Sequence, residues 1–204
     1  MEKFLALTEE KQKAIIEAGF CCFGKMGYKK ASVSDIASAA GISKGMIFHY
    51  FGSKKAMYLY LVNIGYQELI HAFETEFDKN VHDFFDIIIS GTRCKIAAMR
   101  EHPSLMKFLT SIYYESDSEV VTEVQEFLKM GEAFRTNLTL SDIDMDKFKD
   151  TVSPPLVLQL LTKYAEGYIG NMPPGDDFDM DKMLKEFMEC VFMMKNNFYK
   201  EEYL

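Results

Sequence analysis

The chain has 204 residues, of which 48% are hydrophobic and 26% are charged, the ordinary proportions of a globular protein. Its net charge of −8 argues against attraction of the chain as a whole to nucleic acid. The charge is divided unevenly, because residues 1–58 hold nine lysines and five acids, a net +4, and the remainder carries −12. Any phosphate-binding surface is therefore expected within the first 58 residues.

The cysteine spacing argues against a zinc-binding protein, and the lack of long apolar runs argues against a membrane protein. Cys21, Cys22, Cys94 and Cys190 show no C-x-x-C spacing, and no histidine is placed to complete a zinc set. We expect buried thiols in a reducing cytoplasm, with no metal and no cofactor. The sequence contains no window of about 18 apolar residues, and no apolar run follows a basic stretch near the amino terminus. The protein is therefore predicted to be cytoplasmic, without a membrane span or signal peptide.

The first predicted helix begins at Thr8, after a frayed lead-in of residues 1–7, and ends by Gly27. Acids follow Thr8 directly, as is typical of a first helical turn. Gly19 in its middle costs about 1 kcal/mol relative to alanine, so we expect close packing against another helix there. Apolar residues recur at spacings of three and four, namely Ile15, Ile16, Phe20 and Phe23.

Two short helices are predicted within residues 32–51. Ser32 is a suitable N-cap for the first helix, and Gly41 ends it because glycine adopts a left-handed turn without a Cβ penalty. Ser43 caps the second helix, which runs to Phe51 and turns Ile47 inward. Such a pair with a glycine turn is a helix-turn-helix, which can place its second helix in the major groove of DNA.

The second of these helices has a composition suited to DNA. Gly45 lets the backbone approach base edges closely, and Lys44 can reach a guanine edge or a phosphate. Further phosphate donors are His49, Tyr50, Lys54 and Lys55. A corner of two helices with a glycine turn also occurs in purely structural proteins, so the unit alone leaves both interpretations open.

After Phe51, the apolar periodicity predicts helices along the whole remaining sequence. Ser53 begins a long helix that ends near Asp78. Further helices are predicted at about 82–101, 104–115, 118–138, 154–171 and 179–200. The prediction is an all-α chain of about nine helices, with a helix-turn-helix domain at 1–53 and a larger helical domain at 54–204.

The larger domain contains no catalytic constellation, so we expect no enzyme activity. Its histidines are isolated, and neither H-E-x-x-H nor G-x-S-x-G occurs. The acidic runs 142–146 and 176–181 lack the glycine and terminal glutamate of an EF-hand. Solvated charge is therefore expected there, and no metal site.

Methionine and phenylalanine are abundant in the larger domain, with ten Met and twelve Phe after residue 58. Flexible thioethers and aromatic rings suit an adaptable apolar pocket, although a core position is the competing interpretation for each of them. The candidates for an effector pocket are Met99, Met106, Phe108, Tyr113, Phe134, Tyr164 and Tyr168.

Three runs of sequence resemble the amino-terminal domain of TetR-type transcriptional regulators. They are GYKKASVSDIA at 27–37, AGISKG at 40–45 and FHYFGSK at 48–54. The match extends from about Ile15 to Met57 and combines many fixed spacings. Beyond residue 60, the chain resembles the family only in its length and in its predicted helical content.

This resemblance implies a homodimeric repressor, paired through its last two helices, that binds palindromic half-sites of a double-stranded DNA operator and is released by a small amphipathic effector. Met46 stands where a small hydroxyl residue is common, and Phe48 where tyrosine is usual, which removes a phosphate donor. Their effect on sequence preference is left open. The implied DNA contacts are Ser32, Ser43, Lys44, Gly45, Met46, Phe48, His49, Tyr50 and Lys54. The alternative is a helical protein that uses the same scaffold for protein contacts or for non-specific DNA coating.

Overall fold

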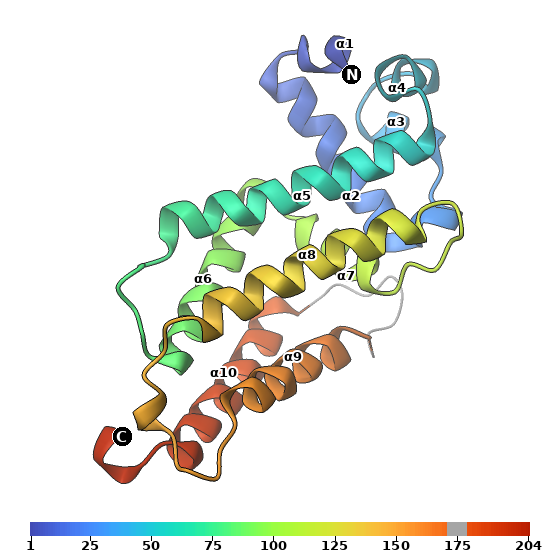
Figure 1. Ribbon diagram of the computed structural model, residues 1–204. Helices are drawn as coiled ribbons and strands as arrows, with labels where there is room; N and C mark the ends of the chain where they lie inside the picture. The colour runs from blue at the N-terminus through green and yellow to red at the C-terminus, as the bar shows by residue number, and fades with distance from the viewer. Residues whose placement is uncertain (171–178) are drawn as a thin grey trace. The chain divides into compact units, whose positions relative to one another are not determined.

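The computed structural model describes residues 1–170 and 179–204, without the side chains of residues 99–101, 169, 170 and 180. Within these limits the chain forms ten α-helices and two short 3-10 turns, and no strand (Figure 1). The all-α prediction is confirmed, and the helix beyond the nine predicted ones is the first. No helix in the described ranges combines the length and the hydropathy that a bilayer span requires.

Ten α-helices make up most of the described part of the chain. In chain order they are α1 (Glu2–Leu5), α2 (Glu9–Lys30), α3 (Val33–Ala39), α4 (Lys44–Phe51), α5 (Lys54–Glu76), α6 (Phe84–Glu101), α7 (Leu105–Tyr113), α8 (Val121–Leu140), α9 (Pro154–Gly170) and α10 (Met180–Phe198).

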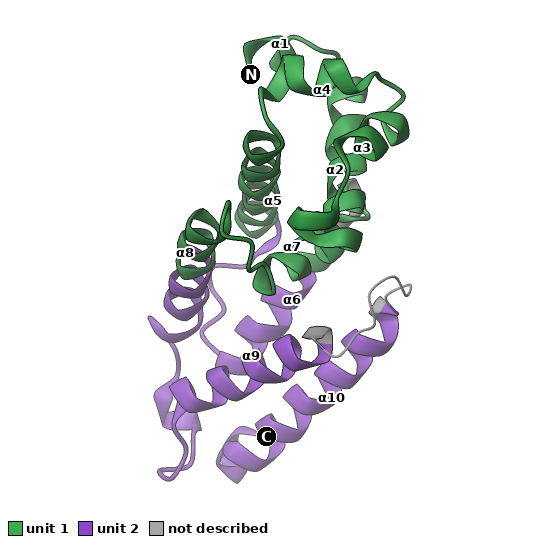
Figure 2. Cartoon of the chain, turned by 90° about the vertical axis from the view of Figure 1, so that its right-hand side faces the viewer, with its two compact units in different colours: residues 1–75, 95–129 green, residues 76–94, 130–204 purple. Residues whose placement is uncertain are grey.

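The chain divides into two compact units (Figure 2). The first unit comprises residues 1–75 and 95–129, and the second comprises residues 76–94 and 130–204. This division does not follow the predicted boundary after residue 53, because α2 packs along α7 and draws the middle of the chain into the first unit. A separation by function at residue 53 stays a proposal.

The amino-terminal lead-in is an ordered part of the first unit, contrary to the prediction that it is frayed. Phe4 in α1 is fully buried. Its ring centroid lies 6.1 Å from that of Tyr50, 4.9 Å from that of Phe51 and 5.4 Å from that of Tyr60. Such aromatic pairs add about 0.5–1.5 kcal/mol beyond area burial. A single aromatic residue makes no periodic pattern, so this anchor could not be predicted from the sequence.

Glycines let α2 pack closely on two other helices of the first unit. A Cβ atom on Gly24 would lie 2.9 Å from the backbone nitrogen of Phe108 in α7. One on Gly19 would lie 2.5 Å from Leu61 Cδ1 in α5, so the close packing predicted for Gly19 is confirmed. The regular helix ends at Gly27 as predicted, because that residue, at φ 67° and ψ 172°, leaves the helical conformation, and α2 continues beyond this kink for one further turn.

The second unit is organised around the start of α6. Asp83 caps this helix by accepting hydrogen bonds from the amides of Phe85 and Asp86, both at 3.1 Å. Its carboxylate also lies 3.0 Å from Lys147 Nζ and 3.3 Å from Lys195 Nζ. Burial alone would raise the pKa of Asp83, but these hydrogen bonds and charges outweigh burial and hold the pKa below its ordinary value.

An aromatic cluster fills the core beside this carboxylate. Phe85 and Phe148 each contact both of the other aromatic residues, Phe84 and Tyr199, and also each other, with ring centroids between 4.9 and 6.1 Å apart. Phe148 and Tyr199 also form an isolated antiparallel bridge that ties the end of the chain to the segment before α9.

Candidate nucleic-acid interface

The helix-turn-helix of the first unit consists of α3, a glycine turn and α4. Ser32 Oγ accepts hydrogen bonds from the amides two and three residues further on, at 3.2 and 3.4 Å, which confirms it as the N-cap. Gly41 has φ 67°, and the amide of Ile42 donates to the carbonyl of Ala37 at 2.9 Å. The predicted glycine stop is therefore confirmed, and it sets the angle at which α4 leaves the turn.

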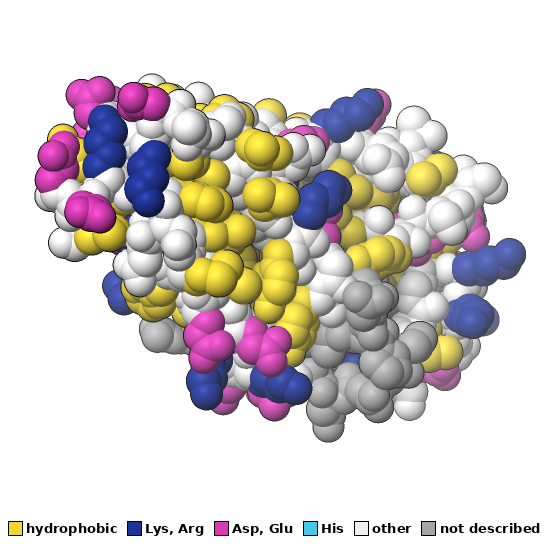
Figure 3. All heavy atoms as spheres, turned by 90° about the horizontal axis from the view of Figure 1, so that it is seen from below, with side chains coloured by type: hydrophobic (Ala, Val, Ile, Leu, Met, Phe, Trp, Pro, Cys, Tyr) yellow, Lys and Arg dark blue, Asp and Glu magenta, His cyan; other side chains and the backbone are white. Residues whose placement is uncertain are grey.

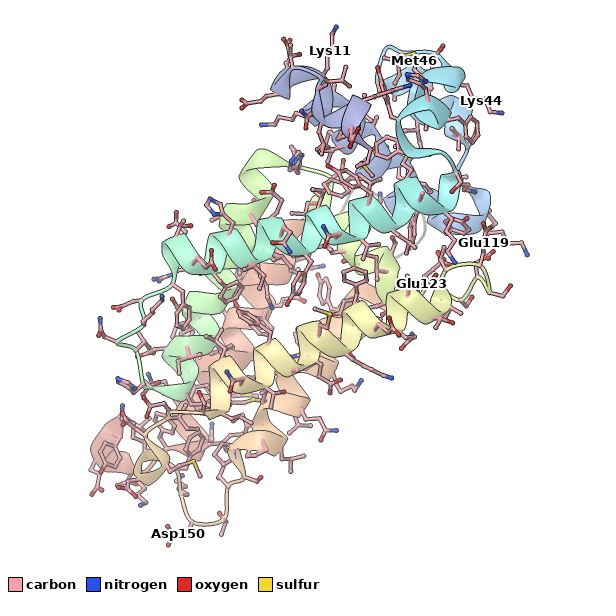
Figure 4. The ribbon with its side chains drawn as sticks, turned by 45° about the horizontal axis from the view of Figure 1, so that its top comes forward. Lys11, Lys44, Met46, Glu119, Glu123 and Asp150 are labelled. Atoms are coloured by element: carbon pink, nitrogen blue, oxygen red, sulfur yellow. The ribbon has the colours of Figure 1, made fainter. Side chains whose placement is uncertain are left out.

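Three side chains hold α4 against the rest of the first unit. Ile47 is fully buried, and Tyr50 and Phe51 are each 6% exposed. They recur at three and four residues and so occupy one side of the helix. The side opposite Ile47 carries Gly45 and His49, and Figure 4 shows the exposed side chains of Lys44 and Met46, which lie on the two flanks of the helix. The exposed residues of α4 and its cap are Ser43, Lys44, Gly45, Met46, Phe48 and His49.

These six residues belong to the nine for which DNA contact is predicted, and the other three have different surroundings. Ser32 is half-buried as the cap of α3. Tyr50 lies in the core, where its ring contacts Phe4. Tyr50 is therefore not part of the exposed surface of α4. Lys54 is half-buried at the start of α5.

Lys54 joins the start of α5 to the end of α2. Its ammonium group donates to the carbonyl of Lys29 at 3.3 Å and lies 4.7 Å from the ring centroid of Tyr28. Burial raises the pKa of the Tyr28 hydroxyl, and the carboxylate of Glu119 adds to that effect. The ring therefore stays neutral beneath the lysine, in a cation–π contact that contributes about 0.5–1 kcal/mol.

An acidic segment, residues 115–123, lies beside these basic residues in the same unit. Glu115 Oε2 accepts a hydrogen bond from the amide of Tyr28 at 2.8 Å. Glu123 Oε1 lies 2.6 Å from Lys55 Nζ, and the hydrogen bond from Lys55 is the main cause of the lowered pKa of Glu123. Figure 4 labels Glu119 and Glu123 where this segment leads into α8. Sequence reasoning missed both contacts because each joins residues far apart in the chain.

Gly45 is a glycine that the fold does not require. A Cβ atom there would meet only Ser43 Oγ, at 3.8 Å, which is ordinary van der Waals contact. Glycine in a helix costs about 1 kcal/mol relative to alanine. Packing within the protein therefore does not explain why glycine occupies this position. A ligand that approaches the backbone of α4 closely would explain it, because a Cβ atom would obstruct that approach.

The residues predicted for an effector pocket are distributed over both units. In the first unit Phe108 is fully buried against Phe20, with ring centroids 4.9 Å apart, so it serves the core. In the second unit Tyr164 lies 6.5 Å from Tyr168 between ring centroids. The side chain of Met99 is outside the described residues. Of the remaining candidates, Met106 and Phe134 are half-buried and Tyr113 is exposed. The pocket stays a prediction.

Groups that could bind a metal ion were sought among the described side chains. No cluster of three or more His, Cys, Asp or Glu occurs there. Cys94 is buried, Cys21, Cys22 and Cys190 are half-buried, and none of these four described cysteines forms a disulfide.

The amino-terminal part of the chain matches the family described as bacterial regulatory proteins, tetR family, over residues 15–61. It is similar to the HTH-type transcriptional regulator YuxN of Bacillus subtilis, with 42% identity over 60 residues, which are 29% of this chain and 21% of YuxN. It is also similar to the HTH-type transcriptional repressor AcnR of Corynebacterium glutamicum, with 41% identity over 54 residues, which are 26% of this chain and 28% of AcnR. The chain thus matches about a fifth to a quarter of the length of these curated relatives.

The fold as a whole has counterparts among solved structures. A TetR family transcriptional regulator from Chloroflexus aurantiacus superposes with a TM-score of 0.70 and 18% sequence identity, covering 98% of this chain and 99% of that chain. At this identity the likeness extends to the fold alone.

Proposed function

We propose that this chain, which belongs through its amino-terminal domain to the tetR family of bacterial regulatory proteins, is a transcriptional regulator that reads duplex DNA with α4. The observation that carries the proposal is the exposed face of α4, whose first turn presents Lys44 and the unneeded glycine Gly45. Base edges are contacted by the amino-terminal residues of a recognition helix. Ile47 and Phe51, buried behind this turn, hold it in one orientation.

Three lysines of the head, residues 1–58, supply phosphate contacts in this proposal. Lys29, Lys30 and Lys44 are exposed, and the head as a whole carries a net +4. Contacts to phosphates provide much of the affinity of DNA-binding proteins and make it fall steeply with salt. Binding is therefore expected to be salt-dependent even though the whole chain is acidic.

The proposed regulator is a homodimer that pairs through α9 and α10. Hydrophobic side chains gather on the face of the molecule that Figure 3 shows. On these two helices, Leu156, Leu160, Phe192 and Met193 are between 47% and 56% exposed. Exposed apolar groups of this kind favour an interaction site, and two-fold pairing would bury them on both copies. A dimer would present two copies of α4 to half-sites about 34 Å apart, one turn of DNA.

The proposed mode of regulation is repression that a small amphipathic effector relieves. The effector would favour a conformation in which the two α4 helices no longer match the half-site spacing. A coupling of about 1–3 kcal/mol changes operator affinity roughly 5- to 150-fold, which is sufficient for a switch. Native mass spectrometry of the purified protein tests this part. A bound molecule whose removal alters operator affinity supports it, and a bound molecule whose removal leaves affinity unchanged contradicts it.

Selection of bound duplexes from a random pool tests the DNA-binding proposal, followed by titration of the selected duplex and a scrambled one at near-physiological salt. We expect the selected duplex to bind at least 10³-fold more tightly, the lower end for specific recognition. Equal affinity for both duplexes would instead support a non-specific DNA coat.

Lys44→Ala is the variant of choice, because Lys54→Ala would also remove the contacts of Lys54 to Lys29 and Tyr28. Lys11→Ala is the matched control, since Lys11 is an exposed lysine on α2, at a distance from Lys44 in Figure 4. We expect Lys44→Ala to weaken binding of the selected duplex and Lys11→Ala to leave it nearly unchanged. Equal behaviour of the two variants would mean that α4 is not the reading helix.

A further inference from the structure

The first turn of α4 exposes one apolar side chain, that of Met46. This residue is 36% exposed and follows Lys44 and Gly45, which occupy the first two positions of the helix. Phe48 is also exposed, at 40%, but it stands further along the helix. The residues of a recognition helix that contact base edges lie at its amino end. Met46 is therefore the apolar side chain best placed to meet a base.

Helical geometry separates Met46 from the residues that hold α4 in place. Successive residues turn by 100°, because the helix has 3.6 residues per turn. Ile47 at the centre of the buried side therefore stands 100° from Met46, and Gly45 and His49 stand on the outward side. The Met46 side chain thus lies along one flank of the outward face, where no Cβ of Gly45 obstructs close approach.

The chemistry of Met46 restricts what it can recognise. A thioether is at most a weak hydrogen-bond acceptor, and the side chain has no donor. The base edges in the major groove are donors and acceptors, apart from the 5-methyl group of thymine. A methionine that covered a donor or acceptor would remove its water without replacing the hydrogen bond, at a cost in free energy. Contact with a methyl group carries no such cost and buries apolar surface on both partners.

We propose that Met46 selects a thymine 5-methyl group in the operator half-site, while Lys44, in the same first turn of α4, provides the charged contact. This inference rests on the proposed function, since it requires that α4 lie in the major groove. It gives the otherwise unexplained exposure of Met46 a specific role in sequence preference. It also predicts that each half-site contains at least one thymine whose methyl group, and not its hydrogen-bonding edge, is recognised.

Replacement of each thymine in the selected duplex by deoxyuridine, one at a time, tests this proposal, because the exchange removes only the methyl group. We expect roughly a fourfold loss of affinity at one thymine per half-site, the effect of losing one buried apolar carbon. Met46→Ala is expected to bind the thymine and deoxyuridine duplexes equally at that position. Met46→Gln, which keeps the length of the side chain, is expected to lose the methyl preference in the same way.

Met26→Ala is the matched control, because Met26 on α2 is 51% exposed and lies outside the reading helix. It should retain the full preference for thymine. Circular dichroism of each variant confirms that it is folded. The proposal is overturned if no deoxyuridine exchange lowers the affinity of the unaltered chain, or if Met46→Ala keeps the same preference. Recovery of no sequence-selective duplex from the pool would overturn the proposed function itself, an outcome distinct from selective binding without methyl preference.

Discussion

The ammonium nitrogen of Lys55 lies 2.6 Å from a carboxylate oxygen of Glu123, so that the start of α5 is paired with the start of α8. The two side chains are 35% and 37% exposed, which leaves the pair open to competing ions. Ser53 and Lys54 directly precede Lys55, shortly after α4 ends at Phe51. A DNA phosphate that approached this point would compete with Glu123 for Lys55.

Glu123→Gln is therefore expected to raise operator affinity severalfold at low salt and to steepen its decrease with salt, because Lys55 becomes free for a phosphate. Fluorescence anisotropy with a labelled operator at several salt concentrations measures both effects. Glu126→Gln is the matched control, since Glu126 is an exposed acid on the same helix. Identical affinities for the two variants would show that the pairing of Lys55 with Glu123 does not oppose DNA binding.

Gly45→Ala is expected to stabilise the free protein and to weaken DNA binding. The new Cβ atom has space and removes the helix penalty of glycine, so the free energy of unfolding should rise by about 0.5–1 kcal/mol. Operator affinity should fall roughly tenfold, which corresponds to about 1.4 kcal/mol of lost close contact. Urea unfolding and an operator titration measure the two effects.

Gly24→Ala is the comparison variant for Gly45→Ala. Its Cβ atom would lie 2.9 Å from the backbone nitrogen of Phe108, so the free energy of unfolding should fall by about 1–3 kcal/mol. If Gly45→Ala binds the operator as tightly as the unaltered chain does, the result contradicts the proposal that DNA approaches Gly45 closely.

Phe4→Ala should lower the free energy of unfolding by about 3–5 kcal/mol, the usual cost of removing a buried phenylalanine. Phe4 contacts Tyr50 and Phe51 of α4, so operator affinity should fall as well. Chemical unfolding in urea gives the first value. Leu5→Ala is the control, because Leu5 is 57% exposed, and a change within about 0.5 kcal/mol is expected. Similar stabilities of both variants would mean that α1 is dispensable.

Asp83→Asn is expected to lower stability near neutral pH by about 1–3 kcal/mol, since a partly buried carboxylate with two lysine partners is lost. The pKa of Asp83 is lowered in the folded protein, so its contribution is complete above the unfolded value of about 3.9 and is lost as the pH falls through the lower folded value. The difference between the two proteins should therefore shrink below about pH 4. Urea unfolding at pH 7, 4 and 3 checks this.

Asp150→Asn serves as the control for that series. Asp150, labelled in Figure 4, is 97% exposed and lies 3.8 Å from Lys200, so its loss should change stability little at any pH. Burial would lower the pKa values of Lys147 and Lys195, but the carboxylates beside them raise both values, so the contribution of these lysines to stability depends on pH in the opposite direction. It is present below the unfolded value of about 10.4 and is lost as the pH rises through the folded values. A constant difference between Asp83→Asn and the unaltered protein from pH 7 to pH 3 would exclude this role of Asp83.

The predictable parts of the candidate site are those encoded within a few residues. Ser32 and Gly41 mark the cap and the stop of α3 through local backbone chemistry, and both are where the sequence predicts them. The inward position of Ile47 follows from helical periodicity in the same way. The all-α class rests on similar patterns repeated along the chain.

By itself, then, the sequence determined the helices after α1, the helix-turn-helix and the inward position of Ile47. The tertiary structure alone decided that Phe4 anchors α1, that the Tyr50 ring belongs to the core and that Lys55 pairs with Glu123. Caps and periodic faces depend on neighbours within one or two helical turns, whereas these contacts form only when segments distant in the chain pack together. Which exposed residues remain free for DNA is therefore a property of the packed unit.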